Sequence, residues 1–237
     1  MRKPYLKCIV ATLLLCVSAV LPTTAQTKGN GDLTRENLRD SLRQAMETLS
    51  FHPDSVDLML RKASWNLQLE QWQYAKDEYD KVLRKEPYNV AGLFYRAYAN
   101  DKLRRYKFAR LDYLNLLRIV PGNFEAQLGL ALVNHKDQHY TDALDGLKRL
   151  VTAFPDSAGA WAARAGMEKE RNQLELAEYD YTEALKRDPN NSDYLLERAD
   201  IRIKLRKISD ARHDLDAVVK LGTPRIALRE WYNQCKQ

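Results

Sequence analysis

Apolar residues recur along most of the chain at helical spacing, in pairs of amphipathic stretches separated by short polar breaks. In one pair, Leu93 and Ala97 stand four residues apart, and Tyr106, Ala109 and Tyr113 follow at intervals of three and four. Such intervals place the apolar side chains on one face of each helix. The pattern predicts an all-α chain made of antiparallel helix pairs.

The helix pairs repeat every 34 residues, a period marked by Pro53, Pro87, Pro121, Pro155 and Pro189. Counting each proline as position 32 gives five complete units, at 56–89, 90–123, 124–157, 158–191 and 192–225. Proline closes a unit because it cannot continue a helix and restricts the residue before it. After the last of these prolines, Ser192 is a candidate cap for the next helix. No proline-rich linker interrupts the series, so we expect no internal domain boundary.

Two positions of the unit are always alanine. They are position 8, with Ala63, Ala97, Ala131, Ala165 and Ala199, and position 20, with Ala75, Ala109, Ala143, Ala177 and Ala211. Position 24 is tyrosine or leucine, at Tyr79, Tyr113, Leu147, Tyr181 and Leu215. Alanine lets the two helices approach closely, and the larger residue fills the space between neighbouring units. Because one unit cannot bury its apolar face alone, we predict that the units stack into a right-handed superhelix, an α-solenoid.

Opposite charges coincide at positions 7 and 23 of four units, as Lys62–Glu78, Arg96–Asp112, Arg164–Asp180 and Arg198–Asp214. In the third unit both charges are absent, because Leu130 and Gly146 stand at these positions. We therefore predict an ion pair that bridges the two helices in each of the four units. Loss of a partly buried pair of this kind should lower the stability of the fold by more than the ~0–1 kcal/mol of an exposed pair.

Both ends of the array carry a predicted capping helix. On the N-terminal side, residues 26–55 form a linker and one helix, over 33–49. On the C-terminal side, Thr223 and Pro224 have the pattern of a cap and a first helical residue, and the helix continues over 226–237. This helix carries an apolar stripe made of Leu228, Trp231, Tyr232 and Cys235.

The first residues, 1–25, have the pattern of a secretory signal. Their basic start consists of Arg2, Lys3 and Lys7. An apolar run of 14 residues follows at 8–21, and a small-residue cleavage site ends at Ala25. At about 1.5 Å per residue this run is shorter than the ~30 Å core of a bilayer, which argues against a membrane anchor. A bacterial lipoprotein signal fits poorly because Leu15 precedes Cys16. We expect an exported protein, periplasmic in a bacterium or otherwise secreted.

Charge and cysteine content narrow the function classes. Without residues 1–25 the chain keeps 35 of 38 basic residues and all 32 acidic ones, which gives a net charge of +3. This mild charge, together with export, argues against nucleic acid as a partner. Cys235 is then the one cysteine left, so no intrachain disulfide can form. We expect Cys235 to pack as a small hydrophobe, with an intermolecular disulfide as the alternative.

The sequence contains no recognisable catalytic or metal-binding motif. His135 and His139 stand four apart and could share a helix face, but a zinc protease would have glutamate where Lys136 stands. No third ligand, nucleophile elbow, phosphate loop or cysteine pair accompanies them. We expect no enzyme, no metal site and no cofactor.

The array resembles the tetratricopeptide repeat family over residues 56–225. The resemblance rests on the alanines at positions 8 and 20, which recur in phase in all five units without insertion, on the tyrosine or leucine at position 24, and on the closing proline, which falls one residue late in the last unit. Two departures stand out. The family's tryptophan at position 4 occurs only as Trp161, and position 7, usually leucine, is charged in four units.

The resemblance implies a concave groove lined by positions 2, 5, 9 and 12 of each first helix. The apolar and small residues expected to bind a partner there are Leu60, Phe94, Tyr98, Leu128, Leu132, Ala162, Gly166 and Leu196. The lysine and asparagine clamp by which some members hold a peptide carboxylate is absent, because position 5 is apolar throughout. Gly166 inside a helix implies either close approach of a neighbouring helix or room for a partner's side chain. Packing against the chain's own N-terminal segment, or among the groove residues themselves, is the alternative to binding.

A basic run between two helices offers a second surface, made of Lys102, Arg104, Arg105, Lys107 and Arg110. It is either a solvated turn or a contact for an anionic surface such as lipid headgroups or acidic glycans. We expect a non-enzymatic scaffold that binds a peptide segment or an amphipathic helix of another protein in the groove. The alternative is a structural component of the cell envelope that self-associates or docks on an anionic membrane.

Overall fold

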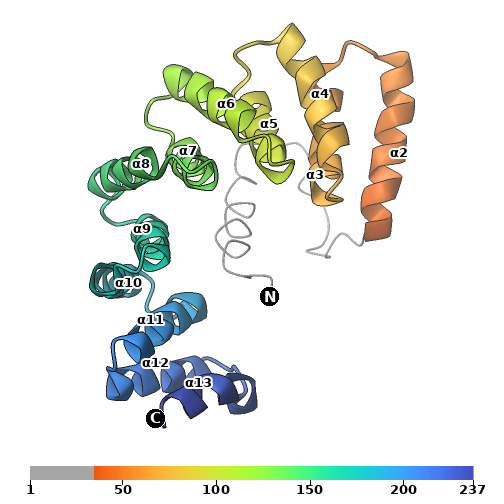
Figure 1. Ribbon diagram of the computed structural model, residues 1–237. Helices are drawn as coiled ribbons and strands as arrows, with labels where there is room; N and C mark the ends of the chain where they lie inside the picture. Colours follow the sequence, from red (N-terminus) through yellow and green to blue (C-terminus); the bar gives the residue numbers. More distant parts are fainter. Residues whose placement is uncertain (1–34, 237) are drawn as a thin grey trace. The chain divides into compact units, whose positions relative to one another are not determined.

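The computed structural model describes residues 35–236, and within this range every regular element is a helix (Figure 1). The predicted all-α class is therefore confirmed. The predicted signal, 1–25, and the first part of the predicted linker lie outside the described residues.

The described residues form two compact units, 35–143 and 144–236, and the division falls inside one helix, α8 (Tyr140–Ala153). The expectation of no internal domain boundary stays a prediction. A continuous helix leaves no proline or glycine linker behind, so the sequence shows no sign of the division. The division lies in the repeat where Leu130 and Gly146 stand in place of an ion pair.

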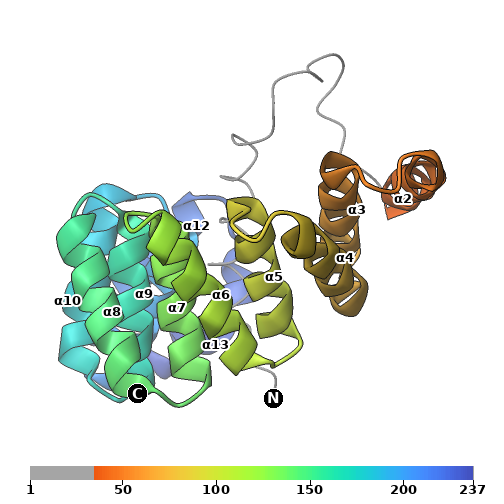
Figure 2. The same ribbon diagram turned by 90° about the horizontal axis from the view of Figure 1, so that it is seen from above.

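In the first compact unit the helices follow one another as neighbours joined by short turns (Figures 1 and 2). They are α2 (Arg35–Phe51), α3 (Val56–Gln68), α4 (Trp72–Lys85), α5 (Val90–Lys102), α6 (Tyr106–Ile119) and α7 (Phe124–Lys136). Helix α3 also contacts α5, and α5 contacts α7, whereas α4 and α6 make at most marginal contact. In both views α5 lies between α3 and α7. Helices α3, α5 and α7 thus form an inner layer, and α4 and α6 an outer layer.

The second compact unit contains the end of α8 and the rest of the chain. Its elements are α9 (Ala158–Glu170), α10 (Leu174–Arg187), α11 (Ser192–Lys204), α12 (Ile208–Lys220), the 3₁₀ helix η2 (Arg225–Leu228) and α13 (Arg229–Gln234). Consecutive helices from α9 to α12 pack pairwise, and α13 contacts α12.

The C-terminal cap differs from its prediction. Pro224 precedes η2 with a ψ of 132°, an extended value, so it is not the first residue of an α-helix. The chain instead makes one 3₁₀ turn before the short α13. The predicted stripe still packs, because Leu228 and Cys235 are buried and Trp231 and Tyr232 lie against them. Burial also raises the pKa of the Cys235 thiol, as expected of a packed rather than a reactive cysteine.

Side-chain caps begin the first helix of each pair. The caps are Ser55, Asn89, Asn123, Ser157 and Asn191, whose side-chain oxygens accept a bond from the backbone N–H three residues later at 2.7–3.3 Å. Each cap satisfies a donor that the first turn leaves unpaired. The predicted cap, Ser192, is wrong by one position, because Asn191 is the cap and Ser192 is the first residue of α11.

The turn between the two helices of a pair uses left-handed backbone at a non-glycine residue. These residues are Glu70, Arg104, Gln138, Asn172 and Arg206, with φ between 59° and 65°. All five share position 15 of the repeat. Left-handed backbone costs roughly 1–2 kcal/mol for a residue with a Cβ, so helix packing must hold these turns in place. Sequence analysis missed the position because its residues share no chemistry.

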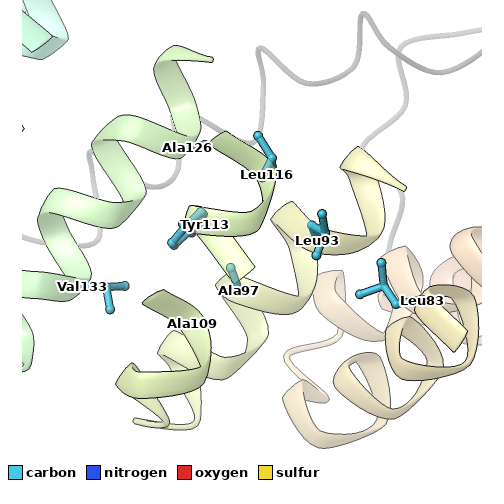
Figure 3. Close-up of a cluster of buried hydrophobic side chains, with 8 residues drawn as sticks. All are labelled: Leu83, Leu93, Ala97, Ala109, Tyr113, Leu116, Ala126 and Val133. Atoms are coloured by element: carbon cyan, nitrogen blue, oxygen red, sulfur yellow. The ribbon is translucent and has the colours of Figure 1, made fainter. Parts of the chain in front are cut away.

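The predicted core positions are buried. All ten alanines at positions 8 and 20 are 0–1% exposed. Figure 3 shows Ala97, Ala109 and Tyr113 in one cluster of the first unit, with Leu83, Leu93, Leu116, Ala126 and Val133 around them. The small side chains let α5 and α6 approach, and the Tyr113 ring fills the space toward α7.

The lack of a side chain at Gly129 on α7 leaves room for the Tyr113 ring. A Cβ at Gly129 would lie 2.5 Å from Cζ of Tyr113, which is shorter than any van der Waals contact allows. The tyrosine ring therefore occupies the volume that a side chain on α7 would take. This requirement was not visible in the sequence, where position 6 of the repeat shows no pattern.

All four predicted ion pairs are present. Lys62 Nζ lies 2.8 Å from Glu78 Oε1, Arg96 Nη2 lies 2.6 Å from Asp112 Oδ1, Arg164 Nε lies 2.5 Å from Asp180 Oδ2, and Arg198 Nη2 lies 2.7 Å from Asp214 Oδ1. The four carboxylate side chains are 0–8% exposed. Arg96 also reaches Asp80 at 2.9 Å and so joins α4, α5 and α6. A single charged residue thus links the second helix of one repeat to both helices of the next.

Candidate functional site

The predicted groove residues of the first compact unit all lie on the inner layer. They are Leu60 on α3, Phe94 and Tyr98 on α5, and Leu128 and Leu132 on α7. Four of them are partly exposed, but Leu128 is only 2% exposed. A side chain so buried cannot contact a ligand without moving, so we leave Leu128 out of the surface defined next. We call the remaining residues, Leu60, Phe94, Tyr98 and Leu132, the inner face.

Aromatic packing holds Phe94 and Tyr98 in place. The Phe94 ring meets Tyr95 and Tyr113 edge-on, with centroids 5.2 and 5.9 Å away. The Tyr98 ring meets Trp72 edge-on at 6.0 Å. Edge-to-face pairs at these distances are favourable arrangements of aromatic rings. Each ring is therefore fixed by the core on one side and partly open on the other.

Lys102 belongs to this aromatic group and not to an isolated basic turn. Its ammonium lies 5.6 Å from the Trp72 ring centre and 5.1 Å from that of Tyr98, within cation–π range. Burial, together with the nearby carboxylates of Asp101 and Glu70, raises the pKa of Tyr98 to about 12. The phenol is therefore neutral at physiological pH and can donate a hydrogen bond.

Charged groups border the inner face where α5 meets α7. Lys136 Nζ lies 2.5 Å from Oδ2 of the buried Asp101. The other carboxylate oxygen of Asp101 has no hydrogen-bond partner among residues 35–236. His135 turns its ring edge-on to Tyr140, with centroids 5.4 Å apart. One end of the inner face is thus polar and the centre apolar.

The histidines do not assemble a metal centre. His135 contacts Tyr140, and His139 Nε2 lies 3.4 Å from Asp137 Oδ2. In the described part of the chain, no group of three or more histidine, cysteine or acidic residues could hold a metal ion.

In the second compact unit the predicted residues are Ala162 and Gly166 on α9 and Leu196 on α11. Ala162 is only 1% exposed and packs with Ala165 and Tyr181, so its side chain offers almost no surface to a partner. Leu196 is half-buried against the core and keeps an open side. The predicted residues therefore reduce to Gly166 and Leu196 in this unit.

Gly166 does not serve a close helix contact. A Cβ built there would meet only the Tyr181 hydroxyl, at the ordinary distance of 3.7 Å. The sequence left two explanations for Gly166 open. The structure does not show the first of them, close approach of a neighbouring helix. The position is an open place on α9.

Sequence reasoning missed ion pairs between successive first helices. Lys136 joins Asp101, and Lys169 Nζ lies 2.6 Å from Glu197 Oε2 and 2.5 Å from Asp200 Oδ2. Opposite charges on equivalent turns of neighbouring first helices could have predicted them, as they did for positions 7 and 23. These pairs fix adjacent first helices to each other beside the predicted binding residues.

The remaining basic residues lie around the α5–α6 turn. Arg104, Arg105 and Lys107 are exposed, and Arg110 is partly exposed. Elsewhere, an open pocket of about 620 Å³ lies at the end of the second unit and contains none of the predicted residues. It is lined by Arg212, Asp216, Arg225, Ile226, Arg229, Tyr232, Asn233 and Lys236.

Repeated helix pairs with packed alanine contacts define each unit as part of an α-solenoid. Residues 128–192 match the family model of the tetratricopeptide repeat. This match, with the fold of solved tetratricopeptide repeat proteins, confirms the resemblance to that family.

Three solved structures illustrate the likeness. A tetratricopeptide repeat protein from Parabacteroides merdae is 18% identical with a TM-score of 0.68, over 86% of this chain and 79% of that chain. PilW, described as a widely conserved type IV pilus biogenesis factor, is 19% identical with a TM-score of 0.68, over 76% of this chain and 84% of its own. YrrB, described as having an unusual peptide-binding site, is 16% identical with a TM-score of 0.55, over 76% and 93%. Identities this low show the fold alone.

A search of curated proteins found no match to this sequence. Residues 35–236 include no helix with the length and hydropathy of a membrane span.

Proposed function

We propose that this chain is an exported scaffold that binds a segment of another protein on its inner face. Tetratricopeptide folds work as protein–protein interaction scaffolds, and the class is generally non-catalytic. The observation that carries the proposal is the pair Phe94 and Tyr98, rigidly held by core contacts yet partly open. Tyrosine is among the residues enriched at the positions that dominate binding energy in protein interfaces, and a ring already held in place loses little conformational freedom on binding.

The chemistry of the inner face suits an extended segment or an amphipathic helix. Leu60, Phe94 and Leu132 offer an apolar strip, while the Tyr98 hydroxyl and the Asp101–Lys136 pair can order a polar edge. A partner with apolar residues on one side and charge on the other matches this arrangement. YrrB, a protein of this fold, is described as having an unusual peptide-binding site, which supports peptide binding as the activity.

Two further parts of the proposal rest on sequence. Export rests on the signal pattern of residues 1–25, which lie outside the described residues. A non-enzymatic role rests on the lack of a catalytic motif, with no cofactor required. The alternative, an envelope component docking on an anionic membrane, would use a different face of the same unit.

The inner face can be tested with peptides from a displayed random library selected on the purified chain. Leu132→Glu places a charge on the inner face at a side chain that is partly exposed. We expect selected peptides to bind this variant about tenfold or more weakly. Tyr74→Glu, on the exposed surface of α4, is the matched control and should leave binding unchanged. Equal binding by Leu132→Glu, with helicity intact by circular dichroism, would reject the inner face.

A further inference from the structure

Helix α6 carries an apolar row on its outer side. Phe108, Leu111 and Leu114 follow one another at intervals of three residues and so lie along one face. They are 62%, 52% and 41% exposed. These side chains do not build the core of this unit, because the α6 residues that do so lie on the opposite side of the helix.

The chain's own repeats show that the fold does not require this row. The three residues occupy positions 19, 22 and 25 of the repeat. The same positions carry Asp142, Asp145 and Lys148 in α8, and Asp210, His213 and Asp216 in α12. In α4 and α10, one or two of the three are apolar. Single exposed apolar residues need no explanation, but a full row on one helix indicates a contact surface.

The helix that carries the row is itself strongly basic. Arg104, Arg105, Lys107 and Arg118 are exposed around it, and Arg110 is partly exposed. Between residues 102 and 123 the single acidic residue is Asp112, which is buried and paired with Arg96. No exposed carboxylate therefore balances the positive charge on this helix. We call Phe108, Leu111, Leu114 and these five basic residues the α6 face.

Charge decides between the occupants of the α6 face. A second copy meeting it face to face would bring two basic surfaces together, which charge repulsion disfavours. The basic residues are spread from 104 to 118, along the whole helix of about 21 Å, and not gathered around one pocket. A spread positive charge beside protruding phenylalanine and leucine side chains matches a bilayer with anionic headgroups, where such side chains enter the interface.

We propose that the α6 face docks the protein on an anionic lipid bilayer. The basic residues contact the headgroups, and the apolar row inserts at the boundary with the acyl chains. Because α6 belongs to the outer layer and the predicted partner site to the inner layer, both contacts can be made at once. The proposal does not depend on peptide binding and can fail without affecting it.

The test is co-sedimentation with phosphatidylcholine vesicles, with and without phosphatidylglycerol. The chain lacking residues 1–25 is used, because it keeps every described helix while removing the apolar run at 8–21. We expect binding to vesicles that contain phosphatidylglycerol, weakened by added salt, and little binding to phosphatidylcholine alone. Failure to bind anionic vesicles at low salt would overturn the proposal and leave an acidic protein as the occupant.

Two variants locate the contact. Arg104→Gln/Lys107→Gln/Arg110→Gln should weaken vesicle binding on the order of 100-fold, since each basic residue near an anionic surface contributes about fivefold. The control Arg206→Gln/Lys220→Gln/Arg229→Gln removes the same charge elsewhere and should have a much smaller effect. An equal loss in both triple variants would overturn the assignment to α6, because net charge alone would then explain binding.

The apolar row has its own matched pair. Phe108→Ser/Leu111→Ser should weaken binding about tenfold or more, because the inserted apolar area is lost. Leu176→Ser/Tyr179→Ser changes the same repeat positions on α10, at similar exposure, and should bind as the parent does. Unchanged binding by the α6 variant would contradict insertion of the apolar row into the bilayer. Circular dichroism checks that both variants are folded.

Discussion

The buried ion pairs are the residue-scale feature that most shapes stability. In each, a carboxylate that water can scarcely reach is held by a basic residue 16 positions before it. The balance is visible at Glu78, where burial opposes the charged form but bonds from Lys62 and Lys81 outweigh it and lower its pKa. Such pairs need not stabilise more than apolar residues would, but losing one partner leaves a buried charge behind.

Asp180→Ala should therefore destabilise the protein by about 3 kcal/mol, because Arg164 loses both of its hydrogen bonds to the carboxylate. This loss of stability is at the low end of the range for a broken buried ion pair, because Glu168 lies 3.9 Å from Arg164 and can partly replace Asp180. Thermal unfolding measures the effect, expected as a fall in Tm of roughly 6–12 °C. Asp145→Ala, at an exposed site on α8, is the control and should leave Tm nearly unchanged.

Glu168 predicts a pH dependence. Burial and the nearby Asp180 carboxylate together raise its pKa from 4.5 to about 7, against the opposing effect of Arg164 and Lys148. The folded chain thus binds this proton more tightly than the unfolded chain does. Its contribution to stability is present at low pH and is lost as pH rises through about 7.

We therefore expect Glu168→Gln to raise Tm at pH 8 by roughly 2–4 °C, about 1 kcal/mol, while changing it little at pH 5. The measurement is Tm against pH for both proteins, because the difference isolates this group from the histidines. If Tm changed with pH in the same way in both proteins, the raised pKa of Glu168 would be contradicted.

At the scale of single elements, α9 carries a glycine that its packing does not need. Gly166→Ala should stabilise the protein by about 1 kcal/mol, because glycine is a poor helix former and the added methyl group meets nothing closer than 3.7 Å. Denaturant unfolding gives the free energy directly. Gly129→Ala on α7 is the contrasting variant and should destabilise, since its Cβ would overlap the Tyr113 ring. Stabilisation by both substitutions would show that the space at Gly129 is not required.

The elements were largely predictable because the repeat supplies five observations of each position. Alanine burial and the ion pairs follow from chemistry that recurs at fixed spacing. The features that were missed or misplaced lie at positions where no distinctive residue type recurs. The left-handed residue of each turn, such as Arg104, varies in type, and the cap at Asn191 was misplaced by one because Ser192 caps equally well by sequence.

The candidate site was predictable only in outline. Repeat position places a side chain on the inner layer, but how deeply it is buried depends on the neighbours around it. Leu128 and Ala162 occupy predicted binding positions and are nevertheless buried, while Phe94 at the same position 5 stays partly open. The open α6 row was missed because the repeat was used to find shared residues, whereas this surface is a departure from them.

At the scale of the whole molecule, the first unit presents two surfaces of different chemistry. The inner face is apolar with a paired polar edge, and the α6 face is apolar with basic residues and no exposed carboxylate on the same helix. A scaffold of this kind would hold a protein segment on one layer while the other rests on a membrane. The two activities should respond to separate substitutions, so Leu132→Glu should leave vesicle binding intact.

The central claim is that the inner layer receives the partner. A photoreactive phenylalanine analogue placed at Leu132, and separately at Tyr74, tests it with a peptide selected on the parent protein. The account predicts efficient crosslinking from position 132 and none from position 74, with competition by unlabelled peptide. Crosslinking from position 74 alone, or from both positions equally, would contradict it.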